Sequence, residues 1–209
     1  MRIGVDFDNT LVSYDRAFAL VGKQASFLPP DFMGNKEAVK ARLLDSGPDG
    51  LRRWEKLQGL VYGRHIDRAE LFEGVAEFFK CCGAGKHPVY IVSHKTELAH
   101  HDDQRTNLRE CALRWMTSRK FFDREGFGLC AENVFFAGTR DEKIGRIAAL
   151  ECDVFIDDLV DVLGHADMPA SCRKILFRSD KLGPFEAVSS WYDICDAIFG
   201  KHRGDPANG

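Results

Sequence analysis

Short apolar runs bounded by polar residues or glycine recur along the chain and predict β-strands. Each run is rich in β-branched or aromatic residues and lacks the alternation of apolar and polar positions that marks a half-exposed strand. Near-continuous apolar runs of this length are typical of parallel strands that helices cover on both faces. The runs are residues 3–5, 89–92, 134–136, 154–156 and 175–177.

Between these runs, apolar residues recur at the three- and four-residue spacing of amphipathic helices. This spacing occurs at 71–79 before the second run, at 108–115 after it, and at 144–150 before the fourth. Strands that alternate with helices predict βαβ units. We therefore expect an α/β fold, a Rossmann-like parallel sheet of about five strands flanked by helices.

One stretch interrupts the alternation. Residues 13–66 contain no convincing strand, but they carry Pro29-Pro30, Gly47-Pro48 and helical patterns at 37–44 and 51–62. We expect a small α-helical cap here, inserted into a core domain made of residues 1–12 and 67–200. The polar segment 201–209 is expected to be a disordered tail.

Length and charge narrow the class of protein. A chain of 209 residues suits one domain plus a small insertion. The net charge of −3 gives no basic excess, which weighs against nucleic acid or an anionic membrane as a partner. The seven cysteines form no C-x-x-C pair, so we expect reduced thiols rather than a zinc ribbon. With no leader and no long apolar segment, we expect a cytoplasmic protein without a membrane anchor.

Polar residues follow the ends of the predicted strands. In an open α/β sheet, ligands bind beyond the carboxyl ends of the strands. Four separate segments could therefore deliver carboxylates, a hydroxyl and an ammonium group to one crevice. These side chains are Asp6, Asp8, Ser93, Lys143, Asp157 and Asp158.

That set of groups suits the chemistry of a phosphate ester. Crowded carboxylates repel one another unless a cation neutralises them, and a few hard oxygen ligands suit Mg²⁺. Mg²⁺ attracts a phosphate, while a lysine and a hydroxyl bind the remaining phosphate oxygens. One carboxylate can act as a nucleophile and form an aspartyl-phosphate. A second can protonate the leaving oxygen and later deprotonate water.

Four motifs in order make the chain resemble the haloacid dehalogenase (HAD) superfamily of phosphohydrolases. Asp6-Phe7-Asp8-Asn9-Thr10-Leu11 is similar to the first motif, D-x-D-x-T/V. The apolar run that ends at Ser93 is similar to the second, Lys143 in Asp-Glu-Lys-Ile-Gly to the third, and Ile156-Asp157-Asp158 to the fourth. Residues 70–75 also resemble the helix start that commonly precedes the second motif.

The resemblance implies roles for these residues. Asp6 is the expected nucleophile, and Asp8 is the expected general acid/base, which favours phosphoryl transfer over dehalogenation. The implied phosphate contacts are Asn9, Thr10, Ser93, His94 and Lys143. The implied Mg²⁺ ligands are Asp6, Asp8 through its backbone carbonyl, Asp157 and Asp158, with Asp158 favoured over Asp157 as the direct ligand.

Other residues near these motifs have two interpretations. His94 and Lys95 follow Ser93 and could contact the substrate or form a surface loop. Arg140 competes with Lys143 as a phosphate ligand. The segment His100-His101-Asp102-Asp103 is interpreted as a solvated loop rather than a metal site. The basic residues of the predicted cap could contact an anionic substrate or form a solvated helix face; they are Arg52, Arg53, Lys56 and Arg64.

We therefore expect a Mg²⁺-dependent phosphatase that acts on a small phosphorylated metabolite, a sugar phosphate or a nucleotide. Three alternatives remain open at this point. They are a phosphotransferase or mutase of the same superfamily, a phosphatase acting on nucleic-acid ends, and a binding protein with a vestigial site. The complete set of site residues weighs against the vestigial site. The sequence does not indicate the oligomeric state.

Overall fold

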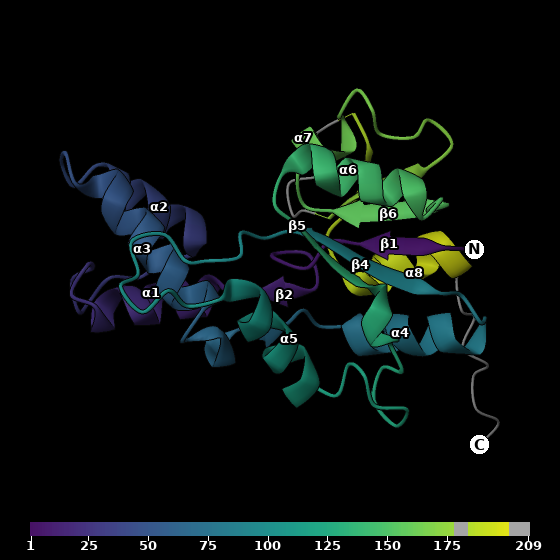
Figure 1. Ribbon diagram of the computed structural model, residues 1–209, viewed down its shortest axis with the longest axis horizontal. Helices are drawn as coiled ribbons and strands as arrows, with labels where there is room; N and C mark the ends of the chain where they lie inside the picture. The colour runs from purple at the N-terminus through teal and green to yellow at the C-terminus, as the bar shows by residue number, and fades with distance from the viewer. Residues whose placement is uncertain (178–183, 201–209) are drawn as a thin grey trace, which may run out of the picture.

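A computed structural model of the protein describes residues 1–177 and 184–200. Its centre is a sheet of six strands in the order β5-β4-β1-β6-β7-β8, and all neighbouring pairs are parallel (Figure 1). The strands are β1 (Ile3–Val5), β4 (Val89–His94), β5 (Val134–Ala137), β6 (Val154–Asp157), β7 (Arg173–Phe177) and β8 (Glu186–Val188).

Helices cover both faces of this sheet. On one face lie α6 (Arg140–Ala149) and the short α7 (Val160–Leu163) (Figure 1). On the other face lie α4 (Val75–Ala84), α5 (Leu108–Ser118) and α8 (Trp191–Phe199) (Figure 1). Two single-turn 3₁₀ helices, Ile66–Arg68 and Ala131–Asn133, lie in connecting segments.

Side-chain alternation along the strands builds a separate apolar core on each face. Ile91 and Ile156 belong to the larger core, under α4, α5 and α8, whereas their neighbours Val92 and Phe155 belong to the smaller core under α6 and α7. Successive residues of a strand point to opposite faces, so a strand buried on both sides must be apolar at every position. This is why the strand-forming runs of the sequence are continuous.

The predicted parallel α/β sheet is confirmed, and it has one strand more than the five runs indicated. The additional strand, β8, pairs with β7 at the sheet edge and has only three residues, of which Val188 alone is buried. A three-residue edge strand with one buried side chain produces no apolar run. The predicted tail at 201–209 lies outside the described residues.

A two-stranded antiparallel ribbon marks where the chain leaves the core and returns to it. In this ribbon β2 (Val12–Ser13) pairs with β3 (Glu70–Leu71). The helical pattern predicted from Leu71 is therefore wrong at its start, because Leu71 pairs with Val12. Helix α4 begins only after Gly74. The φ of Gly74 is 90°, a left-handed conformation that separates the β2–β3 ribbon from the helix.

Between β2 and β3 the chain forms three helices, α1 (Asp15–Gln24), α2 (Lys36–Leu44) and α3 (Gly50–Tyr62), which we call the cap helices. They lie beyond the carboxyl ends of the strands (Figure 1). Aromatic contacts hold them together: Phe18 of α1 stacks on Trp54 of α3 at 5.1 Å between ring centroids, and it meets Tyr62 edge-on at 5.6 Å. The buried apolar residues of the cap helices continue the larger apolar core of the sheet.

The segment 96–107, which joins β4 to α5, runs along helix α3, and we call it the arm (Figure 1). Asp102 of the arm pairs with Arg64 at 3.1 Å, and His101 contacts Glu55 at 2.9 Å. Ala99 of the arm packs closely against Gly59 of α3. A Cβ atom added at Gly59 would lie 3.0 Å from the Cβ atom of Ala99. The arm thus connects the core to the cap helices at a place distant from the β2–β3 ribbon.

None of the helices in the described part of the chain combines the length and apolar character needed to cross a membrane.

Candidate functional site

Strand β1 ends at the centre of the sheet and presents Asp6 there. The Asp6 backbone amide donates to the Ile156 carbonyl at 2.9 Å, which continues the pairing with β6. The chain then turns at Asn9, whose φ of 62° lies in the left-handed region that asparagine tolerates better than most residues. This turn holds Asp8 beside Asp6 at the carboxyl end of the sheet.

Lys143 joins two carboxylates in the interior. Its Nζ atom donates to Asp6 Oδ1 and to Asp157 Oδ2, each at 2.6 Å, and its side chain is 2% exposed. Burial alone would lower the pKa of Lys143, but the two carboxylates outweigh burial and raise it. The lysine is therefore a fixed positive charge between β1 and β6.

The start of α6 explains how Lys143 reaches this place. Thr139 caps the helix by accepting from the Glu142 amide at 3.2 Å, while the Glu142 carboxylate accepts from the Gly138 amide at 2.7 Å. Such reciprocal capping fixes the first turn of a helix. Lys143 lies in that turn and points to the sheet interior.

Three carboxylates come together between the ends of β1 and β6. Asp6, Asp157 and Asp158 each offer an oxygen, and these atoms lie within 4.8 Å of one another. Burial raises the pKa of Asp157 and of Asp158, and the neighbouring carboxylates raise both further. A divalent cation would relieve this repulsion, so the donor set fits Mg²⁺.

The two acidic residues of the fourth motif have different surroundings. Asp157 is fully buried, and both its oxygens are occupied, one by Lys143 and the other by the Leu159 amide at 2.9 Å. Asp158 borders the cavity and receives one long hydrogen bond from Thr10 Oγ1 at 3.4 Å. Asp158 is thus the member of the pair with oxygen atoms available to a ligand.

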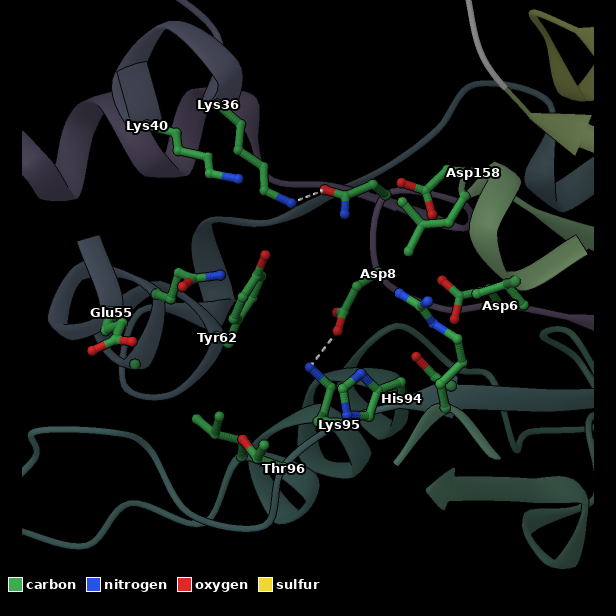
Figure 2. A pocket seen from close by; sticks show the side chains of 18 of the residues that line it. Asp6, Asp8, Lys36, Lys40, Glu55, Tyr62, His94, Lys95, Thr96 and Asp158 are labelled. Carbon is green, nitrogen blue, oxygen red and sulfur yellow. Dashed lines mark hydrogen bonds and ion pairs between the residues drawn. The ribbon is translucent and has the colours of Figure 1, made fainter. Parts of the chain in front are cut away.

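Asp8 is held by two side chains. Lys95 Nζ lies 2.6 Å from its Oδ2 (Figure 2). The Tyr14 hydroxyl donates to its Oδ1 at 2.6 Å. Lys95 is buried, and its Nζ lies 4.8 Å from the centroid of the Tyr62 ring. The two contacts fix the orientation of the Asp8 carboxylate.

Ser93 and His94, neighbours at the end of β4, differ in their contacts. Ser93 is 1% exposed, and its Oγ atom has no hydrogen-bond partner among the described residues. His94 is exposed, and its Nε2 atom lies 3.0 Å from the Gly138 carbonyl oxygen. A buried hydroxyl without a partner costs stability unless a ligand satisfies it. The Ser93 hydroxyl therefore indicates that a polar group of a ligand binds next to it.

A cavity of about 580 Å³ lies between the core and the cap helices. It holds the carboxylates Asp6, Asp8 and Asp158 on the core side, and Lys36, Lys40 and Tyr62 on the cap side (Figure 2). Lys36 Nζ donates across it to Asn9 Oδ1 at 3.1 Å. The residues from the sequence-derived set that line the cavity are Asp6, Asp8, Asn9, Ser93, His94, Lys143 and Asp158, together with Arg140.

Two of the sequence-derived residues lie behind the cavity wall. Thr10 is fully buried, donates to Asp158, and receives the Trp191 indole N–H on its carbonyl oxygen at 2.9 Å. Asp157 is buried beneath Lys143. Both support residues that border the cavity and do not border it themselves.

The sequence patterns predict no role for Tyr14 or Lys36, and they allow two interpretations of Lys95. Strand alternation could have favoured Lys95, because it lies two residues after Ser93 and so points to the same side of the sheet. No local pattern marks Tyr14 or Lys36, because their place depends on how the cap helices pack.

Comparisons with known proteins identify the fold. No protein-family model and no curated protein matches the sequence. Solved structures do match, with 95% of this chain aligned to 95% of a HAD-superfamily hydrolase from Ehrlichia chaffeensis, at 16% identity and a TM-score of 0.58. A HAD family hydrolase from Deinococcus radiodurans, crystallised with phosphate and sodium, aligns over 94% of both chains at 18% identity and a TM-score of 0.54.

A predicted phosphoglycolate phosphatase from Haemophilus somnus also matches, covering 94% of this chain and 96% of its own, at 12% identity and a TM-score of 0.53. These likenesses extend over almost the whole chain. The chain has the HAD-like fold, and the resemblance seen in the sequence motifs is confirmed at the level of the fold.

Proposed function

We propose that the protein is a Mg²⁺-dependent phosphatase that hydrolyses a small phosphate monoester. One observation carries the proposal: Ser93, whose hydroxyl has no partner among the described residues, lines one cavity together with Lys143 and the carboxylates Asp6 and Asp158. A hydroxyl and an ammonium group suit phosphate oxygens, and crowded carboxylates suit the cation that binds with phosphate. The HAD-like fold supports the same activity.

Asp6, Asp158 and the Asp8 backbone carbonyl are the proposed ligands of Mg²⁺. Asp157, whose oxygens are occupied, is proposed to hold Lys143 and order the site. When bound, the cation supplies a positive charge that neutralises the phosphate oxygens. Ser93 and Lys143 bind the transferring phosphoryl group, with Asn9 and His94 at its edge and Thr10 supporting Asp158.

The reaction has two proposed steps. In the first, the Asp6 oxygen not held by Lys143 attacks phosphorus, the bond to the leaving oxygen breaks, and Asp8 gives that oxygen its proton. In the second, water attacks phosphorus, Asp8 takes the water proton, and the bond to Asp6 breaks to release phosphate. Lys95 and Tyr14 orient Asp8 in both steps. The cap helices restrict access of bulk water.

The experiment is phosphate release from a panel of sugar phosphates and nucleotides, with Mg²⁺ or with EDTA. We expect release that requires Mg²⁺ and that falls about a thousandfold or more in Asp6→Asn, because an amide is not a nucleophile. Asp8→Asn should slow turnover while retaining Mg²⁺ binding. Asp167→Asn, which changes an exposed carboxylate outside the cavity, is the matched control and should retain wild-type activity.

Two results would contradict the proposal: wild-type turnover by Asp6→Asn, or release unaffected by EDTA. Release only in the presence of an added alcohol acceptor would identify a phosphotransferase instead. Salt-dependent binding of DNA or RNA would favour the nucleic-acid alternative.

We also infer a cytoplasmic location, which the thiols support. Cys82, Cys111, Cys152, Cys172 and Cys195 are buried and not disulfide-bonded, as expected in a reducing compartment.

A further inference from the structure

Two lysines on one helix face the same part of the cavity. Lys36 and Lys40 lie one turn apart on α2, and their ammonium groups point from the cap side toward the space above the Tyr62 hydroxyl (Figure 2). The carboxylates Asp6, Asp8 and Asp158 lie on the opposite, core side (Figure 2). The two lysines thus stand on the cap side of the cavity, and Lys36 reaches Asn9 at the edge of the proposed phosphoryl site.

These two lysines differ from the other cations of the cavity in their partners. Lys95 pairs with Asp8, Lys143 with Asp6 and Asp157, and Arg140 with Asp161 at 3.6 Å. Within residues 1–177 and 184–200, neither Lys36 nor Lys40 forms an ion pair. The acidic residues on the cap side of the cavity are not ion-pair partners of these two lysines. Glu55 pairs with His101, and Glu37 makes no ion pair with either lysine in the described ranges.

Such an arrangement is unfavourable without an anion. Like charges four residues apart on a helix repel each other. Lys36 is half-buried, and its hydrogen bond to Asn9 Oδ1 is made to a neutral acceptor. Burial acts to lower the pKa of Lys36, yet Tyr62 and the charges of Asp8 and Asp158 raise it, so the ammonium group keeps its proton.

The acidic cluster does not remove this imbalance in the proposed active state. Asp8 is already paired with Lys95, and a divalent cation would neutralise Asp6 and Asp158. Lys36 and Lys40 would then have no carboxylate partner among the described residues of the cavity, which leaves both ammonium groups available to anionic groups of a substrate. At about 580 Å³, the cavity has room for a phosphoryl group and a further substituent on the leaving group.

We propose that Lys36 and Lys40 bind a second anionic group of the substrate, a carboxylate or a second phosphate carried on the leaving group. The inference rests on the proposed phosphatase function and specifies its substrate class. The scissile phosphate lies at Ser93 and Lys143, and the second anion lies at the cap. Because α2 supplies both lysines, binding of such a substrate also bridges the core and the cap helices.

The test compares esters that differ in one substituent. The neutral ester is propanediol monophosphate, which ends in a hydroxymethyl group. Two further esters carry a carboxylate or a second phosphate in place of that group. A matching hexanediol series places a longer chain between the two ends. We expect kcat/KM for the anionic esters to exceed that for the neutral ester by about tenfold or more. Comparison of the carboxylate ester with the bisphosphate shows which of the two anions the site prefers.

The double variant Lys36→Met/Lys40→Met should bring that ratio close to one. Lys40→Met alone is the second variant, because Lys40 is exposed on α2 and its loss does not unpack the cap, and it should lower the ratio partially. Lys56→Met is the matched control, an exposed lysine of α3 that does not line this cavity, and it should leave the ratio unchanged.

Binding measured by titration calorimetry in Asp6→Asn separates this inference from the phosphatase function. The expected result is tighter binding of the anionic esters, lost when Lys36 and Lys40 are also replaced, whether or not the wild type turns any ester over. Equal kcat/KM and equal affinity for neutral and anionic esters would overturn the inference and leave the phosphatase standing. Preference for an anionic ester that persists in the double variant would also overturn it.

Discussion

Ser93 offers the sharpest test at the scale of single residues. Its hydroxyl is buried without a partner among the described residues, so its removal takes no hydrogen bond from the free protein. We expect Ser93→Ala to leave the free energy of unfolding unchanged or slightly higher, while kcat/KM falls about ten- to a hundredfold because a phosphate oxygen loses its donor. Urea unfolding and steady-state kinetics measure the two effects separately.

Ser118→Ala is a matched control for that substitution. The Ser118 hydroxyl donates to the Trp115 carbonyl at 2.7 Å on α5, outside the cavity, so its loss should lower stability by about 1 kcal/mol and leave kcat/KM unchanged. A loss of stability in Ser93→Ala as large as in Ser118→Ala would show that Ser93 is a structural residue.

The acidic pair predicts a pH dependence of stability. Because the pKa of Asp158 and of Asp157 is raised in the folded protein, the folded state binds more protons than the unfolded state above about pH 4. In EDTA, their contribution to stability should therefore decrease as pH rises from about 4 toward the raised values. Asp158→Asn should flatten this dependence, and Mg²⁺ should reverse it, because the cation binds the ionised form.

Thermal unfolding between about pH 4 and neutrality, with EDTA or with Mg²⁺, checks that expectation. Asp167→Asn is the control, since its carboxylate is exposed. If wild type and Asp158→Asn changed stability in parallel with pH, the crowded carboxylates would not be the source.

The residue scale also shows what the sequence could and could not predict. Asp6, Asp8 and Ser93 were predictable because each lies at the end of an apolar strand, and parallel strands bring their carboxyl ends together. Lys36 was not predictable, because its position depends on three cap helices packing against one another and against the core. Leu71 was assigned to a helix because its spacing to Val75 is helical, and only its pairing with Val12 in space excludes that.

At the scale of elements, the arm and helix α3 give a matched pair of glycine substitutions. Gly59 lies inside α3 against Ala99 of the arm, and Gly145 lies inside α6 with open space around it. Alanine in a helix interior is favoured over glycine by about 0.5–1 kcal/mol. We expect Gly145→Ala to gain that stability and Gly59→Ala not to gain it, because the new methyl group must displace the arm.

Urea unfolding measures this difference in stability. Limited trypsin digestion after Arg105 reports whether the arm has separated from α3, and cleavage should be faster in Gly59→Ala than in the wild type. Equal stabilisation by both substitutions, with unchanged cleavage, would show that the arm does not press on α3.

The sequence predicts some strands better than others, and the reason is again how their residues are packed. The runs of β1, β4 and β6 are continuous because both sides of each strand are buried under helices. Strands β2, β3 and β8 each have at most one buried residue, unlike β1, whose three residues are all buried, so pairing with a neighbour rather than composition defines them. Such elements have no pattern that a sequence can display.

At the scale of the whole molecule, the cysteines report on global opening. Burial raises the pKa of Cys82 and Cys152 to about 12 and that of Cys172 to about 11, so few thiolates exist at neutral pH. We expect iodoacetamide to leave these three thiols unmodified in the native protein and to modify them in urea, as measured by mass spectrometry of peptides.

Cys130 is the reference in that experiment, because it is exposed on the surface. Modification of Cys152 without denaturant, at the rate of Cys130, would mean that the sheet face under α6 opens in the native state.

The central position of β1 in the sheet determines when this strand can be paired on both sides during synthesis. Strand β1 pairs with β4 and β6, which begin at Val89 and Val154, and Asp6 contacts Lys143, which lies 137 positions later in the chain. At ordinary elongation rates the strand waits on the order of ten seconds for its second neighbour. Asp6 is thus synthesised well before Lys143 and Asp158, so a nascent chain that ends before β6 does not yet hold the cluster of carboxylates.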